Sequence, residues 1–143
     1  MTRLEEYRRV APPGVIDIIL KLAERVQGRR LLHLTGGRFG GGAPETLRTV
    51  VPILSELAID ASWEITTGDP GFYATATALR AALEGAERAL SDAALDHYVE
   101  MNRVNAKKLA LEADVVLVHA IEPGTLIEQR PASGRWVWRC HVN

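Results

Sequence analysis

The apolar positions of this chain alternate between a helical period and short runs of strand length. Residues 15–26 carry apolar side chains at helical intervals, and Gly28 follows them as a stop signal. The run at 31–34 predicts a strand. Residues 44–57 predict a second helix, with Pro52 inside it where one backbone hydrogen bond is lost. Residues 59–66 predict the next strand, and residues 72–83 predict an alanine-rich helix that Gly85 ends.

The second half of the chain continues this pattern. Residues 92–112 predict a longer helix that Ser91 or Asp92 caps. Four consecutive branched apolar residues at 115–118 predict a strand buried on both faces, as in a parallel sheet. Residues 125–129 predict a short helix, and residues 136–142 alternate as a last strand. Helices therefore separate the strands, which predicts an α/β fold: one domain over residues 1–143 with a Rossmann-like open parallel sheet of about four strands and helices on both faces.

A glycine-rich segment joins the first predicted strand to the helix that follows it. Five glycines fall within residues 36–42. Glycines let the backbone come close to a ligand, and the start of a helix presents unpaired N–H groups, so an anionic or polyhydroxy ligand would fit there. The spacing matches neither G-x-x-x-x-G-K-[ST] nor G-x-G-x-x-G. The segment is either a ligand cradle or a flexible turn.

Polar side chains follow the other predicted strands. In an open parallel sheet, the ligand crevice lies outside the carboxyl ends of the strands. The third strand leads to His119 and Glu122, and the last strand leads to Arg139 and His141. A histidine beside a carboxylate suits acid/base chemistry or the binding of sugar hydroxyls, which makes His119 and Glu122 the candidate catalytic residues. The alternative is that both residues cap the short helix that follows. Alternation turns Cys140 away from its neighbours, as a buried, inert thiol.

Composition and charge mainly exclude some classes of partner and of site. Seventeen basic and eighteen acidic residues leave a net charge of -1, so there is no electrostatic case for nucleic acid or an anionic membrane as a partner. The apolar runs are too short to span a bilayer, and the charged residues 1–10 do not form a signal peptide. One cysteine and four scattered histidines have neither disulfide nor zinc spacing. We expect a cytoplasmic protein with no metal and no cofactor.

Several motifs, taken together and in order, resemble one known family. The motifs are Leu32-His33, Arg38-Phe39-Gly40-Gly41-Gly42 with Glu45, Trp63-Glu64, Gly68-Asp69, Phe72-Tyr73, and Trp136-Val137-Trp138-Arg139-Cys140-His141. They are similar to the amino-terminal part of the trehalose-synthesising retaining glycosyltransferases, which move glucose from a nucleotide diphosphate sugar to free glucose. The resemblance runs over nearly the whole chain.

The resemblance implies an architecture and a set of site residues. The architecture is GT-B, with two Rossmann-like domains, of which this chain would be the acceptor-side domain and the nucleotide-binding half would be absent. Gly40, Gly41 and Gly42 would lie beside the donor diphosphate, with Arg38 and Glu45 in the same binding segment. His119 would stand at the acceptor cleft, and Arg139 and His141 would belong to the cleft wall. The implied partners are a nucleotide diphosphate sugar and a sugar acceptor, once the missing half is supplied.

The chain departs from the family pattern at polar positions. Family members tend to read H-D-P-Q-P where this chain has His119-Ala120-Ile121-Glu122-Pro123, and Arg80 takes the place of a histidine. Scaffold positions are kept while positions that would bind hydroxyls are changed. Arg80 and Glu122 are therefore candidate ligand-binding residues of an altered site. We expect the chain to be inactive alone. The alternative is a non-catalytic Rossmann-like fragment, natural or engineered, that self-associates as a homodimer, joins a second domain or binds a small ligand.

Overall fold

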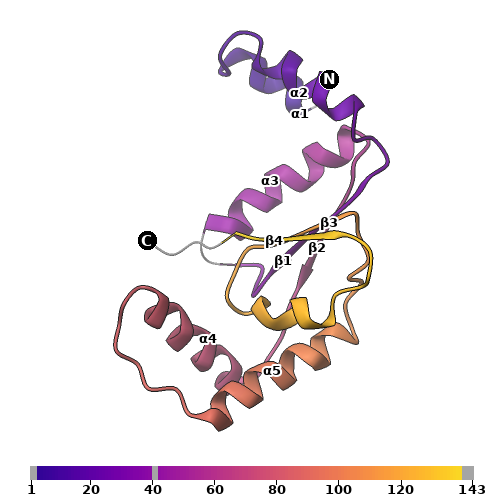
Figure 1. The fold of residues 1–143 in the computed structure, drawn as a ribbon. Coiled ribbons are helices and arrows are strands. Elements are labelled where there is room, and N and C mark those ends of the chain that lie inside the picture. Colours follow the sequence, from indigo (N-terminus) through magenta and orange to yellow (C-terminus); the bar gives the residue numbers. More distant parts are fainter. Residues whose placement is uncertain (1–2, 40–41, 140–143) are drawn as a thin grey trace.

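The centre of the molecule is a sheet of four parallel strands. The computed structural model of the protein describes residues 3–39 and 42–139. The strands are β1 Arg30–Thr35, β2 Asp60–Ile65, β3 Val115–Val118 and β4 Arg135–Trp138, and they lie side by side in the order β2-β1-β3-β4. The sheet is open, and helices lie on both sides of it (Figure 1). This arrangement confirms the predicted α/β, Rossmann-like fold class.

The helices form layers around this sheet. They are α1 Arg3–Glu6, η1 Tyr7–Arg9, α2 Val15–Glu24, α3 Gly42–Glu56, α4 Pro70–Leu83, α5 Asp92–Ala106 and η2 Gly124–Gln129. Figure 1 shows α3 on one side of the sheet and α4, α5 and η2 on the other, with α1 and α2 beyond α3. Within the described ranges, no helix combines the length and apolar character needed to cross a bilayer.

The main core lies between the sheet and the layer of α5 and η2. Residues opposite each other in a parallel sheet point to the same face, and Leu32 pairs with Val116 as Leu34 pairs with Val118. These four side chains pack with Leu126 of η2. A second apolar cluster between α4 and α5 contains Phe72, Ala76, Tyr98 and Ile121.

The opposite face of the sheet is less well covered than the sequence predicts. Val116 and Val118 are buried, but Val115 and Leu117 are only half-buried. The prediction that β3 is buried on both faces is therefore wrong. On β4, which lies at the edge of the sheet, Val137 is 47% exposed. On the core side, Trp136 packs against the main cluster, whereas Trp138 is 50% exposed.

Side-chain caps fix where two helices begin. The carboxylate of Asp69 accepts a hydrogen bond from the backbone N–H of Phe72 at 2.8 Å, and Pro70 occupies the first position of α4. Asp69 also lies 2.9 Å from Nε2 of His97 on α5, and this contact, followed by the Phe72 hydrogen bond, lowers the pKa of the Asp69 carboxyl. Ser91 caps α5 in the same way, through the N–H of Ala94.

The end of one helix and two short helices near the amino terminus differ from the sequence prediction. The helix predicted over 92–112 ends at Ala106, because the chain turns there and the backbone N–H groups of Lys108 and Leu109 both donate to the carbonyl of Asn105. Leu109 and Leu111 then pack against the sheet core, a tertiary contact that the helical period does not encode. The short helices α1 and η1 were not predicted, since residues 3–9 bury only Leu4 and carry little apolar periodicity.

Substitution of Gly134, which precedes β4, is expected to destabilise the fold. Its φ is +99°, and a Cβ would lie 2.3 Å from the carbonyl oxygen of Ala113. Gly28 also has a positive φ of +73°, but a Cβ there would meet nothing within 4 Å. Gly28→Ala should therefore cost only the backbone strain, about 1–2 kcal/mol. Gly134→Ala should cost about 1–3 kcal/mol more, because β4 must shift. Urea denaturation of both variants measures the difference, and equal losses would contradict this account.

Candidate functional site

The connections of the sheet reverse direction at β1. From β1 the chain passes through α3 to β2 on one side, and then returns through α4 and α5 to β3 on the other side of β1. The loops that leave β1 and β3 therefore turn apart at their carboxyl ends, which is where open α/β sheets bind ligands. Thr35, Gly36 and Gly37 come from the β1 side, and residues 119–122 come from the β3 side. The N–H of His119 donates to the carbonyl of Leu34 at 2.9 Å, so the two sides are in register.

Glu122 lies directly against the backbone of Gly36. A Cβ at Gly36 would fall 2.5 Å from Cδ of Glu122, so a larger residue there would require the Glu122 side chain to move. The Glu122 side chain is 19% exposed, and its Oε1 lies 3.8 Å from a guanidinium nitrogen of Arg80 on α4. Its Oε2 accepts no hydrogen bond from any described residue. The carboxylate thus has one oxygen paired with Arg80 and one buried oxygen against Gly36.

His119 pairs with a second histidine, His33 of β1. Nδ1 of His33 lies 2.9 Å from Nε2 of His119, and the ring centroids are 5.1 Å apart at an interplanar angle of 28°. Both rings are buried, with 3% of His33 and 5% of His119 exposed. Burial lowers the pKa of the His33 imidazole, because removal from water disfavours the charged form. The two rings form a buried, hydrogen-bonded pair beside the carboxyl ends of β1 and β3.

Two side chains of α5 hold the loop after β3. The Tyr98 hydroxyl donates to the carbonyl of Ile121, and burial is the largest cause that raises the pKa of Tyr98 to about 12, so this donor keeps its proton at neutral pH. Nδ2 of Asn102 donates to the carbonyl of Glu122 and to Oγ1 of Thr125, each at 2.9 Å. The interpretation of His119 and Glu122 as helix caps is wrong, because the residue at the N-cap of η2 is Pro123 and no side chain caps that helix.

A third residue of α5 holds the loop after β2. Oδ1 of Asn105 accepts from the backbone N–H of Thr67 at 3.0 Å, and its Nδ2 donates to the Thr67 carbonyl at 2.8 Å. Both backbone groups of Thr67 are therefore satisfied by one buried amide. The same helix positions the exits of β2 and β3.

The segment after β1 is anchored before it reaches α3. Oγ1 of Thr35 accepts from Nε1 of Trp63 at 2.7 Å and donates to the carbonyl of Gly37 at 3.0 Å. Arg38 is exposed, with its guanidinium carbon 5.8 Å from the centroid of the Trp63 ring. A guanidinium nitrogen of Arg48 donates to the Arg38 carbonyl at 2.9 Å. The loop thus begins from a fixed point and carries an exposed cation near the start of α3.

The other candidate residues are spread more widely. Gly42 is the first residue of α3, and Glu45 is exposed in its first turn. Arg139 is exposed, and its backbone N–H donates to the Val118 carbonyl at 2.8 Å. Among the described residues, no hydrogen bond or ion pair joins the side chain of Glu45 or Arg139 to the crevice. Gly40, Gly41, Cys140 and His141 lie outside the described residues.

Sequence reasoning missed three residues of this site. His33 was quoted as part of a motif but was given no role, although it is the one polar side chain within the apolar run at 31–34. Asn102 and Asn105 are spaced three apart, so they lie on one face of α5, and both are buried. A buried amide must be hydrogen-bonded, so this spacing was a usable signal.

A metal site is not apparent in the part of the chain that the structure describes. No group of three or more histidine, cysteine, aspartate or glutamate side chains is arranged there to hold a metal ion.

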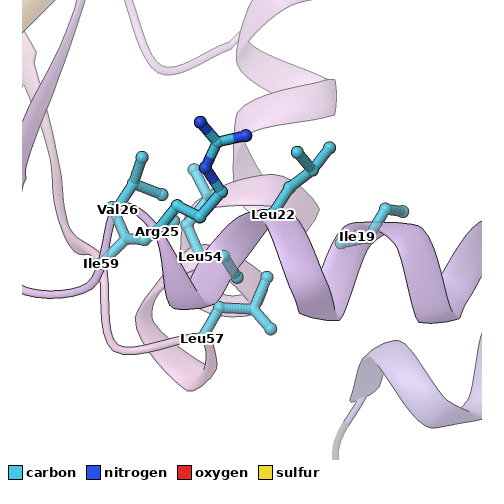
Figure 2. Close-up of a pocket in the computed structure, with 8 residues that line it drawn as sticks. Ile19, Leu22, Arg25, Val26, Leu54, Leu57 and Ile59 are labelled. Carbon is cyan, nitrogen blue, oxygen red and sulfur yellow. The ribbon is translucent and has the colours of Figure 1, made fainter.

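An apolar hollow lies away from the crevice. It has a volume of about 480 Å³ and opens between α2 and the end of α3 (Figure 2). Its lining residues are Ile19, Leu22, Ala23, Arg25, Val26, Leu54, Leu57 and Ile59. Val26 and Ile59 precede β1 and β2, so the hollow lies at the amino-terminal edge of the sheet, opposite to the histidine pair. Its lining offers one charged side chain, Arg25, and no titratable group suited to catalysis.

Removal of the Asn102 amide should loosen the loop that carries Glu122. Asn102→Leu keeps a similar volume but leaves the Glu122 carbonyl without its donor, which costs about 1–3 kcal/mol of unfolding free energy. Amide hydrogen exchange at Gly124, whose N–H donates to Ile121, should also become faster. Arg103→Ala on the exposed face of the same helix is the control, with a change within about 0.5 kcal/mol. Equal exchange at Gly124 in both variants would contradict the role of Asn102.

Comparison with known proteins identifies the family. The family described as trehalose synthase, N-terminal domain, matches residues 33–143. The trehalose synthase of Pyrococcus horikoshii is 34% identical over 143 residues, which is 99% of this chain and 34% of that protein. The trehalose synthase of Rubrobacter xylanophilus is 34% identical over 146 residues, with 98% of this chain and 35% of that protein covered. The chain spans about a third of the length of these curated relatives. It belongs to the trehalose synthase family and corresponds to its amino-terminal domain.

Proposed function

We propose that this chain is the acceptor-side domain of a glycosyltransferase that moves glucose from a nucleotide diphosphate sugar to a sugar acceptor, in the synthesis of trehalose. The observation that carries the proposal is the group of polar side chains at the exits of β1 and β3. There, a carboxylate paired with an arginine and a buried histidine pair occur in a chain of the trehalose synthase family.

The chemistry of the crevice suits a polyhydroxy ligand. Sugar hydroxyls both donate and accept hydrogen bonds, and the site offers one partner of each kind. The Glu122 carboxylate is an acceptor that is 19% exposed, and the Arg80 guanidinium 3.8 Å from it is a donor that is 48% exposed. Arg80 is carried by α4, and Glu122 is carried by the loop to which Tyr98 and Asn102 donate hydrogen bonds.

The segment between β1 and α3 suits the diphosphate of a donor. α3 has 15 residues and begins at Gly42, so its first N–H groups and the positive end of its dipole face the glycine-rich loop. Arg38 adds an exposed cation beside it. The roles of Gly40 and Gly41 in this loop remain part of the proposal.

In this proposal, a second domain binds the nucleotide of the donor. The chain corresponds to about a third of its relatives' length, which leaves room for the nucleotide-binding half of a GT-B enzyme. In this arrangement the crevice forms one wall of an interdomain cleft. Transfer would require both halves, so the chain alone is expected to bind but not to turn over.

A non-catalytic role remains the second candidate, and one observation favours it. Ile18 and Leu22 of α2 and Val26, two residues after its end, are all substantially exposed, and Leu22 and Val26 border the apolar hollow of Figure 2. A surface of this kind suits self-association. Sedimentation velocity distinguishes the candidates, because a module that acts through this surface should be dimeric and Leu22→Lys should make it monomeric. A monomeric wild-type chain would count against this role.

Glucose binding tests the main proposal on the chain alone. In ¹⁵N-labelled protein, added glucose should shift the backbone amides of Gly36, Gly37 and residues 120–122. Glu122→Gln should weaken this binding by about five- to tenfold, because a neutral acceptor replaces a charged one at a loss of roughly 1 kcal/mol. Glu128→Gln, at an exposed position of η2, is the matched control and should leave affinity unchanged.

The same titration has an outcome that would reject the proposal. Shifts confined to α2 and the end of α3, or no shifts at saturating glucose, would show that the crevice does not bind the acceptor. Inorganic pyrophosphate serves as the probe for the glycine-rich loop, where the amides of Gly37 and Gly42 should respond. Arg38→Gln should weaken that response and leave glucose binding unchanged.

A further inference from the structure

The hydrogen bonds of Thr35, at the end of β1, fix the direction in which its hydroxyl points. The indole N–H of Trp63 can only donate, so Oγ1 of Thr35 accepts from it, at 2.7 Å. The hydroxyl has a single proton, and it donates this proton to the carbonyl of Gly37 at 3.0 Å. Thr35 is 1% exposed, which shields both bonds from water. A relay of two hydrogen bonds with one direction therefore runs from β2 to the Gly37 carbonyl.

The pairing of β1 with β2 brings Trp63 to the β1 exit. Thr35 pairs with Ile65, and Trp63 lies two residues before Ile65 on β2, so Thr35 and Trp63 point to the same face of the sheet. Leu34 packs in the core on the side of α5 and η2, so this is the opposite face, on the side of α3 (Figure 1). Trp63 thus approaches the β1 exit from the neighbouring strand, on the side to which the chain continues.

Two successive carbonyls after β1 are bound by protein donors. The Gly37 carbonyl accepts from Thr35, and the Arg38 carbonyl accepts from a guanidinium nitrogen of Arg48 at 2.9 Å. In a trans peptide the N–H points away from the C=O, and the described residues contain no cis peptide. The N–H groups of Arg38 and Phe39 therefore point away from the donors that hold these carbonyls. Neither N–H donates a hydrogen bond to a described residue.

The ring of Trp63 also contacts this segment. The guanidinium carbon of Arg38 lies 5.8 Å from the centroid of the Trp63 ring. This distance falls within the range of about 6 Å over which a cation is attracted to an aromatic face. One side chain of β2 therefore acts on two neighbouring residues, on Gly37 through its N–H and Thr35, and on Arg38 through its ring.

We propose that Trp63 is a positioning residue for the segment that leaves β1. Through Thr35 it holds the peptide between Gly37 and Arg38 in one orientation, and its ring holds the Arg38 guanidinium beside that peptide. The segment then presents an N–H and a cation to an anionic group, and the Gly37 carbonyl oxygen, which would repel an anion, is turned inward. That the anion is the diphosphate of a donor rests on the proposed function, whereas the positioning of Gly37 and Arg38 does not.

The indole proton of Trp63 reports the relay in the chain without any ligand. The chain has three tryptophans, and nuclear Overhauser contacts with Thr35 identify the Trp63 signal. Thr35→Val removes the acceptor at nearly constant volume, so the indole proton should move upfield and exchange faster with solvent. The backbone amide signal of Arg38 should shift as well. Thr35→Ser keeps the hydroxyl and should restore both signals, whereas unchanged signals in Thr35→Val would overturn the proposal.

A pyrophosphate titration measures what this positioning does for an anion. Thr35→Val and Trp63→Phe, which keeps an aromatic face for Arg38, should each raise the Kd for pyrophosphate by about fivefold, the effect of one neutral hydrogen bond. The double variant should bind little more weakly than either single variant, because both substitutions break the same relay. Thr35→Ser should bind as the wild type does. Ser55→Ala removes an exposed hydroxyl from the far end of α3, and this matched control should leave the Kd unchanged.

The outcomes separate this inference from the proposed function. If the wild-type chain binds pyrophosphate and folded Trp63→Phe and Thr35→Val bind it equally well, the positioning role is overturned. If the wild-type chain does not bind pyrophosphate while the indole and Arg38 signals respond to Thr35→Val and recover in Thr35→Ser, the positioning stands and the diphosphate assignment fails. Circular dichroism checks that each variant is folded, and the two Thr35 variants remain decisive if Trp63→Phe is not.

Discussion

The parallel pairing of β1 with β3 is the constraint on which the candidate site depends. The two strands are distant in sequence, and the chain reaches β3 only after it has formed β2 on the other side of β1. Their register places His119 directly after the last paired residues and beside His33. A shift of one residue would turn His33 and Leu117 to the opposite face of the sheet. The core alternation of Leu32, Leu34 and Val116 therefore also specifies the geometry of the polar site.

The candidate site contains two kinds of partly or fully buried polar pair. The Glu122 side chain lies against Gly36, with its Oε1 3.8 Å from a guanidinium nitrogen of Arg80. His33 and His119 are more deeply buried, and a hydrogen bond between the two rings satisfies one nitrogen of each. The site thus places a partly exposed ion pair near a buried histidine pair.

Much of the fold could be predicted from the sequence, because periodicity reports which face of an element is buried. The strand at 115–118, the helix ending at Leu83 and the glycine-rich connection from β1 to α3 were all evident. The end of α5 was not, since Leu109 and Leu111 leave the helix to cover the sheet. The partnership of His33 with His119 was also hidden. It depends on strand order, and a lone histidine in an apolar run has several equally good explanations until its neighbour is known.

The two asparagines of α5 give the site a mechanical property. Asn102 forms a hydrogen bond to the loop after β3, and Asn105 forms two to Thr67 after β2. The two asparagines lie less than one helical turn apart. Any sliding or tilt of α5 would thus carry both loops together, and neither could open alone without breaking buried hydrogen bonds. The β1 exit is tied to both of these loops, because the backbone N–H groups of Thr66 and His119 donate to the carbonyls of Thr35 and Leu34. A displacement of α5 would therefore strain the exits of all three strands at once.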